Sequence, residues 1–131
     1  MRKKIIKTFQ LCLFFLPVLV SAVDVEIIAH RGASFDAPEN TLESVNLGWA
    51  KQADAVEVDV YLSKDGQIVV FHDHNTKKIA GVDLNVVDQT FSELRRLDVG
   101  AWKGKKWKGI RIPKLSDCLL YTSDAADESS S

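Results

Sequence analysis

The sequence predicts an α/β fold, and two stretches of the chain carry that prediction. In the first, a β-branched run at 25–29 leads through a loop into a helical stripe at 41–52. In the second, residues 54–62 alternate with a period of two and are followed by another β-rich run at 67–73. Strands and helices therefore mix along one chain, as in an α/β domain.

The first unit is a strand, a loop and a helix. "VEIIA" at 25–29 is typical of a strand covered on both faces, and it ends directly in "HRG". Asn40 with Glu43 resembles a capping box, which places the helix start there. The apolar stripe of this helix consists of Leu42, Val45 and Trp49.

The two runs at 54–62 and 67–73 are expected to form an antiparallel hairpin, since the four residues between them are too few for a parallel crossover. Asp65 and Gly66 provide the turn. In this register position 59 lies opposite about position 71, which brings His72 within a residue of Asp59.

Further on, Thr90 and Glu93 form a second capping box that starts a short helix. Its apolar stripe is Phe91, Leu94 and Leu97. Residues 100–111 read as a loop rich in Gly and Lys, and "IPKLSD" at 112–117 as the entry to another helix.

Both ends of the chain are set apart from this domain. Residues 1–22 combine a basic start, an apolar run and small residues at a cleavage site, as a secretory signal does. A membrane anchor is the alternative, but the run is shorter than the roughly 20 residues a spanning helix needs, and Pro17 interrupts it. Residues 118–131 resemble translated sequencing adapter, the alternative being a natural disordered tail.

The remaining domain, residues 23–117, contains no cysteine, so it offers neither disulfides nor thiolate metal sites. Four of the 17 basic residues lie in 1–22 and three of the 18 acidic residues lie after 117, which leaves a formal charge of −2. A nucleic-acid binder would show a strongly basic balance.

The strand period places Glu57 and Asp59 on one face of 54–62 and a row of apolar residues, Val56, Val58, Val60 and Leu62, on the other. The apolar face is expected to be the packed one. The two carboxylates either face solvent or, together with His72, converge on a site. Such carboxylates suit a hard cation such as Ca²⁺ or Mg²⁺.

His30 and Arg31 follow the first strand, where the functional loops of α/β folds emerge. Arg31 offers a donor fork for phosphate, and Gly32 would let the backbone approach a ligand. An anion site beside a cation site favours a phosphoester as substrate. His30 and His72 are then candidates for acid and base, with a structural role as the alternative.

Over about residues 27–115 the chain resembles the glycerophosphodiester phosphodiesterase family. The resemblance lies in the motifs "HRG", "PENT", "E-V-D", "KDG" and "HD", in this order, together with "FSELRRLDVGAW" and "IPKL". The resemblance implies a (β/α)₈ TIM barrel that hydrolyses glycerophosphodiesters to sn-glycerol 3-phosphate and an alcohol, with a divalent cation, Ca²⁺ or Mg²⁺. It implies that His30 and His72 act as acid and base, that Glu57 and Asp59 bind the metal and that Arg31 binds phosphate. It also implies that Glu39 and Asn40 support the first loop. Asp73 is expected to orient a neighbour and Asp65 to belong to the turn.

The family supplies a further metal-binding Glu beyond "IPKL", and this chain stops before it. About 95 domain residues can form only the opening portion of a barrel that takes about 250. We therefore expect the chain as written to be poorly stable and inactive. The expected partner is a small glycerophosphodiester, with no nucleic acid and no stable anchor after signal cleavage, in a secreted or periplasmic protein.

Two other functions stay open at this point. One is a related barrel phosphodiesterase acting on whole lipids, of the sphingomyelinase D or phosphatidylinositol phospholipase C kind. The other is a secreted phosphate- or metal-binding module without catalysis. "PENT" and "IPKL" favour the glycerophosphodiesterase, and both histidines together with both acids argue against the module.

Overall fold

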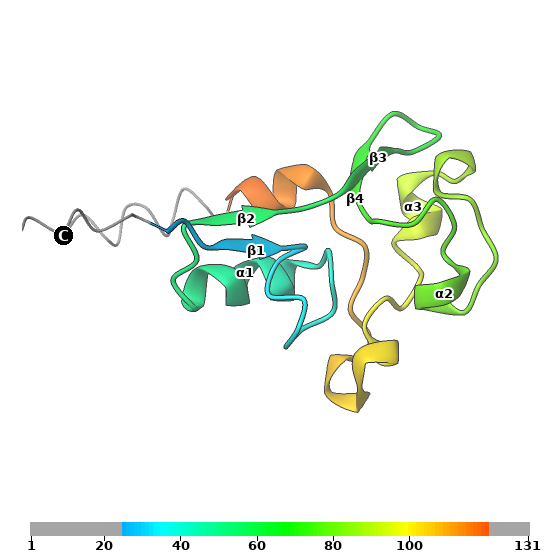
Figure 1. Cartoon of the computed structure of the whole chain (residues 1–131). Coiled ribbons are helices and arrows are strands. Elements are labelled where there is room, and N and C mark those ends of the chain that lie inside the picture. The colour runs from blue at the N-terminus through cyan, green and yellow to red at the C-terminus, as the bar shows by residue number, and fades with distance from the viewer. Residues whose placement is uncertain (1–24, 121–131) are drawn as a thin grey trace, which may run out of the picture.

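The structure is a computed structural model that describes residues 25–120. Short strands and helices alternate along the chain, with several single turns of 3₁₀ helix (Figure 1). The elements are β1 Ile28–His30, α1 Leu42–Ala50, β2 Ala55–Glu57, β3 Val60–Leu62, β4 Ile68–Val70, α2 Lys77–Ala80, η1 Val86–Asp88, α3 Phe91–Leu94, η2 Ala101–Lys103 and η3 Lys105–Trp107. Residues 115–120 are also helical.

The first unit is a parallel β-α-β arrangement. β1 pairs with β2 in parallel, with His30 opposite Glu57. Helix α1 lies along this pair (Figure 1). Gly48 makes the close packing possible, because a Cβ there would lie 3.0 Å from Val56 and 3.1 Å from Ala29. This arrangement sets the carboxyl ends of β1 and β2 side by side.

Helix α1 starts one residue later than the sequence predicted. Its N-cap is Thr41, whose hydroxyl accepts a hydrogen bond from the Ser44 amide at 3.2 Å, while Thr41 N–H donates to Ser44 Oγ at 3.2 Å. The predicted box of Asn40 and Glu43 is therefore wrong. Asn40 has φ +57° and uses its side chain elsewhere, and Glu43 is exposed.

The predicted hairpin is correct for its distal half only. β3 and β4 pair antiparallel with Val60 opposite Val70, and Phe71 N–H donates to Asp59 O at 3.0 Å, as the predicted register requires. The proximal half, β2, pairs with β1 instead. A break at 58–59 separates the two sheets.

This break explains a wrong prediction about the apolar face. Val56 and Val58 pack against a buried cluster, as expected. Val60 and Leu62 are exposed, and Tyr61 packs against a different cluster instead. Because β3 belongs to a separate sheet, the row of apolar side chains does not meet one continuous core.

The core consists of two clusters of buried residues that meet at β4. Val69 belongs to the larger one and Val70 to the smaller, since successive strand residues point to opposite sides. The larger cluster is Val69, Phe71, Ile79, Val86, Leu94, Val99 and Ile112. The smaller is Val45, Val70 and Cys118, with Leu42, Trp49, Val56, Val58 and Leu115 against it.

Two features of the ends differ from expectation. Ile27 and Ile28 are exposed, so the first strand is not covered on both faces within residues 25–120. Residues 118–120 continue the helix that starts at 115, and Cys118 is buried in the smaller cluster.

The predicted signal, 1–22, and residues 121–131 lie outside the described residues. Within the part that the structure describes, no helix is both long and apolar enough to cross a bilayer.

The capping box predicted for the second helix is confirmed. Thr90 Oγ1 accepts from the Glu93 amide at 3.3 Å, and Glu93 Oε2 accepts from the Thr90 amide at 2.8 Å. Asp65 belongs to the hairpin turn, as predicted, where its Oδ1 accepts from Ser63 Oγ at 2.7 Å. The same oxygen accepts from the Phe91 amide at 2.9 Å, which joins the turn to the start of α3.

Candidate functional site

Arg31 occupies the turn that follows β1 and lies among three carboxylates. Its φ is +56°, a left-handed conformation that is uncommon outside glycine. Its backbone N–H donates to Glu57 Oε2 at 3.0 Å, and its Nη1 donates to Glu39 Oε1 at 3.0 Å. These contacts hold the guanidinium over the carboxyl ends of β1 and β2.

The third carboxylate near Arg31 is Asp59. Arg31 Nε lies 3.3 Å from Asp59 Oδ2, which is ion-pair distance, yet Nε is buried and makes no hydrogen bond among the described residues. We read the contact as electrostatic, because the N–H is not aligned on the oxygen. Arg31 thus balances part of the negative charge of the site.

Asn40 connects the first loop to Asp59 through a reciprocal pair of hydrogen bonds. Its Nδ2 donates to Asp59 Oδ2 at 3.0 Å, and its Oδ1 accepts from the Asp59 backbone N–H at 3.0 Å. The Asn40 amide also donates to Arg31 O at 3.0 Å. Asn40 is buried with φ +57°, so its own strained conformation is fixed by these three bonds.

Gly32 has a packing role that the sequence did not indicate. A Cβ on Gly32 would lie 2.4 Å from Ser44 Oγ and 2.5 Å from the Ser44 carbonyl carbon, and φ is +73°. Ser44 Oγ in turn donates to Arg31 O at 3.0 Å. The glycine therefore lets α1 come against the Arg31 turn; an approach to ligand stays a prediction.

His72 follows β4 and is oriented by Asp73. Its Nδ1 lies 2.6 Å from Asp73 Oδ1, and the pKa of Asp73 is lowered, chiefly by this hydrogen bond. The predicted role of Asp73 in orienting a neighbour is confirmed by this contact. On the other side, Tyr61 OH donates to the His72 carbonyl at 3.1 Å.

A narrow recess brings this histidine to the first loop. Its lining residues are Glu39, Asn40, Phe71, His72, Asp73 and Ile79. The loop that holds Arg31 and the segment after β4 therefore meet at this recess. Phe71 completes the link, because its amide bonds to Asp59.

His30 is placed by its register rather than by a hydrogen bond. It lies opposite Glu57 in the parallel ladder, where paired residues project to the same face. Its side chain is exposed and lines a hollow of about 290 Å³ that also includes Phe35 and Lys51. No hydrogen bond joins His30 to His72 within residues 25–120.

The acids fit part of a cation site. Glu57 uses Oε2 and Asp59 uses Oδ2 for the contacts above, while Glu57 Oε1 and Asp59 Oδ1 accept no hydrogen bond from the described residues. Free carboxylate oxygens are the donors that Ca²⁺ and Mg²⁺ prefer. Across residues 25–120, however, no group of three or more His, Cys, Asp or Glu could hold a metal ion.

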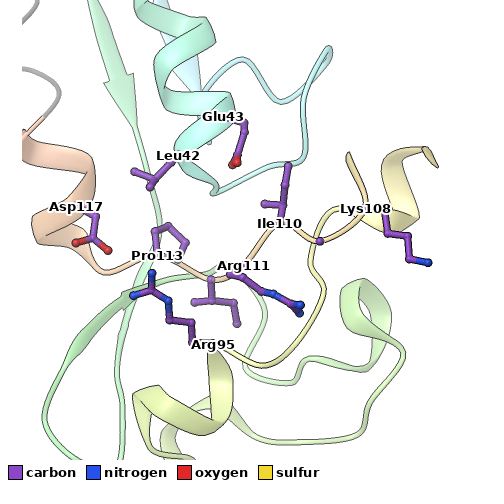
Figure 2. Close-up of a pocket in the computed structure, with 10 residues that line it drawn as sticks. Leu42, Glu43, Arg95, Lys108, Ile110, Arg111, Pro113 and Asp117 are labelled. Carbon is purple, nitrogen blue, oxygen red and sulfur yellow. The ribbon is translucent and has the colours of Figure 1, made fainter. Parts of the chain in front are cut away.

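A larger hollow lies elsewhere and does not coincide with this chemistry. Its volume is about 330 Å³, and it lies between the start of α1, α3 and the helix at 115–120 (Figure 2). Its lining residues are Leu42, Glu43, Arg95, Lys108, Gly109, Ile110, Arg111, Ile112, Pro113 and Asp117. None is a predicted site residue, so we place the candidate site by contacts and not by cavity size.

The sequence missed Ser44 as a support of the site. Ser44 Oγ donates to Arg31 O at 3.0 Å and lies 2.9 Å from Thr41 O, so it joins the helix start to the Arg31 turn. The spacing of Thr41 and Ser44, three residues apart before an apolar stripe, was the available signal.

Comparison with known proteins identifies relatives for most of the chain. The sequence profile of the Glycerophosphoryl diester phosphodiesterase family matches residues 30–128. The chain is 47% identical over 93 residues to the protein YhdW of Bacillus subtilis (strain 168), covering 71% of this chain and 38% of that protein. It is 42% identical over 98 residues to the glycerophosphodiester phosphodiesterase of Caldanaerobacter subterraneus subsp. tengcongensis, covering 75% and 40%.

A solved structure agrees with these relatives. It is a phosphodiesterase of Oleispira antarctica in complex with the product sn-glycerol-3-phosphate, 39% identical, with a TM-score of 0.73. The match covers 77% of this chain and 41% of that one. The chain thus spans about two fifths of the length of the curated relatives named here. Its fold is the predicted incomplete (β/α)₈ barrel, represented by the opening portion.

Proposed function

Because the chain belongs to the glycerophosphoryl diester phosphodiesterase family, we propose that its residues form part of a site that hydrolyses glycerophosphodiesters to sn-glycerol 3-phosphate and an alcohol. One observation carries the proposal. Arg31 lies against Glu57 and Asp59 at the carboxyl ends of two parallel strands, where barrel enzymes place their chemistry.

Arg31 would bind a phosphoryl oxygen of the substrate. Its guanidinium has five N–H donors, of which Nη1 is committed to Glu39. Nε is buried beside Asp59, so the donors left for a tetrahedral anion are those of Nη2 and the second N–H of Nη1, in a partly exposed side chain. The hydrogen bond to Glu39 orients the guanidinium plane of Arg31, so the direction of its N–H donors is set before substrate binds.

Glu57 and Asp59 would hold a divalent cation, Ca²⁺ or Mg²⁺, through the oxygens that accept no hydrogen bond from the described residues. When bound, such an ion supplies Lewis-acid polarisation of the phosphoryl group. Asn40 and Arg31 both contact Asp59 Oδ2, and these contacts leave Oδ1 as the oxygen to offer.

His72 would move a proton at Nε2. Asp73 holds Nδ1, and the lowered pKa of Asp73 keeps that carboxyl ionised, which favours a proton on Nδ1. A neutral His72 then has its lone pair on Nε2. His30, opposite Glu57, would carry the other proton transfer.

Secretion through residues 1–22 is part of the same proposal. The basic start, the apolar run and the small residues at 20–22 support it. The signal can be tested by N-terminal sequencing of the mature protein, which should begin at Val23.

The function is tested in a completed barrel. Residues 25–117 would replace the matching segment of the Caldanaerobacter relative, of which this chain covers 40%. We expect this graft to release sn-glycerol 3-phosphate from glycerophosphocholine with added Ca²⁺ or Mg²⁺. Release of head groups from intact sphingomyelin or phosphatidylinositol in its place would show the lipid-acting alternative.

His72→Ala in the graft should lower kcat by roughly 10²- to 10⁴-fold, the usual contribution of a general acid or base. His74→Ala is the matched control, because His74 is exposed and two residues away. Turnover that survives His72→Ala would overturn the acid–base assignment. Binding of cation without any turnover in the unaltered graft would favour the non-catalytic module. The 131-residue chain alone should show no metal-dependent hydrolysis.

A further inference from the structure

Two exposed segments form a surface that the proposed function does not use. They are the tip of the first loop, 34–36, and residues 101–108, which project toward the same lower edge in Figure 1. Lys103 Nζ donates to Ser34 O at 2.7 Å and joins them. The charges of Lys103 and Lys106 also contribute to the lowered pKa of Asp36, after its contact with Lys51. We name residues 34–36 and 101–108 the aromatic–lysine patch.

The apolar part of this patch is unusually open. Phe35 is 92% exposed and Trp102 is 45% exposed. Trp102 Nε1 donates to Val99 O at 2.9 Å, so its polar atom is satisfied within the fold while the ring faces outward. Trp107, five residues further along the chain, is half-buried. Aromatic rings with a satisfied polar end are suited to the boundary between water and an apolar phase.

The polar part of the patch is mainly cationic, because its one carboxylate, Asp36, is ion-paired with Lys51. Residues 99–116 contain no Asp or Glu, and the patch holds four lysines, Lys103, Lys105, Lys106 and Lys108. Lys103 Nζ lies 5.5 Å from the Trp102 ring centroid, and Lys106 Nζ lies 4.6 Å from that of Trp107. Among residues 25–120 none of the four forms an ion pair with a carboxylate. Their charge is therefore available to a partner.

We propose that the aromatic–lysine patch is a peripheral contact surface for an anionic lipid bilayer. Tryptophan rings settle at the headgroup level, and lysines beside them are attracted to anionic headgroups while their stems lie along apolar surface. Nucleic acid is the less fitting partner, since the whole chain has a formal charge of −1 and the basic stretch is one short loop.

This surface lies next to the candidate site. Phe35 and His30 line the same hollow, and Asp36 and Lys51 line it as well. A bilayer in contact with the patch would bring that hollow close to the lipid headgroups. The proposal does not depend on hydrolysis and goes beyond it.

Tryptophan fluorescence of the full 131-residue chain tests the proposal. The three tryptophans are Trp49, Trp102 and Trp107, so residues 1–24 contribute no signal even if they bind vesicles themselves. With phosphatidylcholine vesicles that contain phosphatidylglycerol and brominated chains, we expect a blue shift and quenching. Trp102→Phe should remove most of the quenched component. Vesicle sedimentation without quenching would overturn the proposal.

Charge variants provide a second measurement. Lys105→Gln and Lys106→Gln should each lower the partition coefficient onto phosphatidylglycerol-containing vesicles by roughly fivefold, the effect expected for one lysine at an anionic surface. Lys64→Gln, in the exposed turn between β3 and β4, is the matched control and should change nothing. Equal quenching by pure phosphatidylcholine, or tighter binding to a DNA duplex than to anionic vesicles, would contradict the proposal.

Discussion

Gly32→Ala should destabilise the fold far more than the same change at another left-handed glycine. The new Cβ would lie 2.4 to 2.7 Å from three atoms of Ser44, one of them backbone, so the start of α1 has to move. The left-handed conformation alone costs an alanine roughly 1–2 kcal/mol. Movement of Ser44 also breaks its bonds with Arg31 O and with the Ala33 amide, at about 1 kcal/mol each. Together these effects should lower the free energy of unfolding of Gly32→Ala by about 3–4 kcal/mol.

Gly66→Ala is the matched control for this prediction. Gly66 has φ +76°, close to the +73° of Gly32, but nothing lies within 4 Å of its missing Cβ. Its cost should therefore be the conformational part alone, roughly 1–2 kcal/mol. Urea unfolding followed by tryptophan fluorescence, with sucrose present to strengthen a marginal fold, measures both. Equal losses for the two variants would refute the packing role of Gly32.

Three further changes test local contacts. Thr90→Ala should lower the free energy of unfolding by about 1 kcal/mol, because the hydroxyl that caps the Glu93 amide is lost; urea unfolding measures this. The pKa of Glu93 is lowered first by the backbone N–H of residue 90, which Ala keeps, and then by the Thr90 hydroxyl, so it should rise only part of the way toward 4.5 in a carboxyl NMR titration. The hydrogen bond with His72 lowers the pKa of Asp73 below its ordinary value of 3.8, so this contact stabilises the fold above about pH 3.8 and its contribution is lost as the pH falls through the lowered pKa. His72→Ala should raise the pKa of Asp73 and reduce the loss of stability at acid pH, which urea midpoints measured against pH would show. Burial raises the pKa of Cys118 to about 11, so a disulfide reagent at pH 8 should label it only after urea is added, as peptide mass spectrometry can follow.

Local signals in the sequence predicted much of the fold because they act between near neighbours. The Asp65 turn fixed the pairing of 59 with 71, and the Thr90 cap fixed α3, since each depends on a few adjacent residues. The break at 58–59 was not predictable in this way. It arises because β2 pairs with β1, and periodicity carries no information about which strand is the partner.

The candidate site was predictable only in part. The position of Asp59 beside the end of β4 followed from the hairpin, whereas the contact of Arg31 with Glu57 depends on the parallel pairing of β1 with β2, which the sequence did not predict. The contact of Asn40 with Asp59 and the packing role of Gly32 were missed. Both depend on how the first loop folds back on α1 and on Asp59, a tertiary contact that overrides the capping pattern.

The cation dependence of the grafted barrel tests the central claim most directly. Formation of sn-glycerol 3-phosphate would be followed against free Ca²⁺ or Mg²⁺ in the unaltered graft and in Glu57→Gln, with Glu43→Gln as an exposed control. The account predicts that Glu57→Gln moves the midpoint of cation dependence to at least tenfold higher concentration, since it weakens a ligand oxygen next to Arg31. A midpoint that stays unchanged in Glu57→Gln would show that Glu57 is not a ligand of the cation, which would contradict the proposed site.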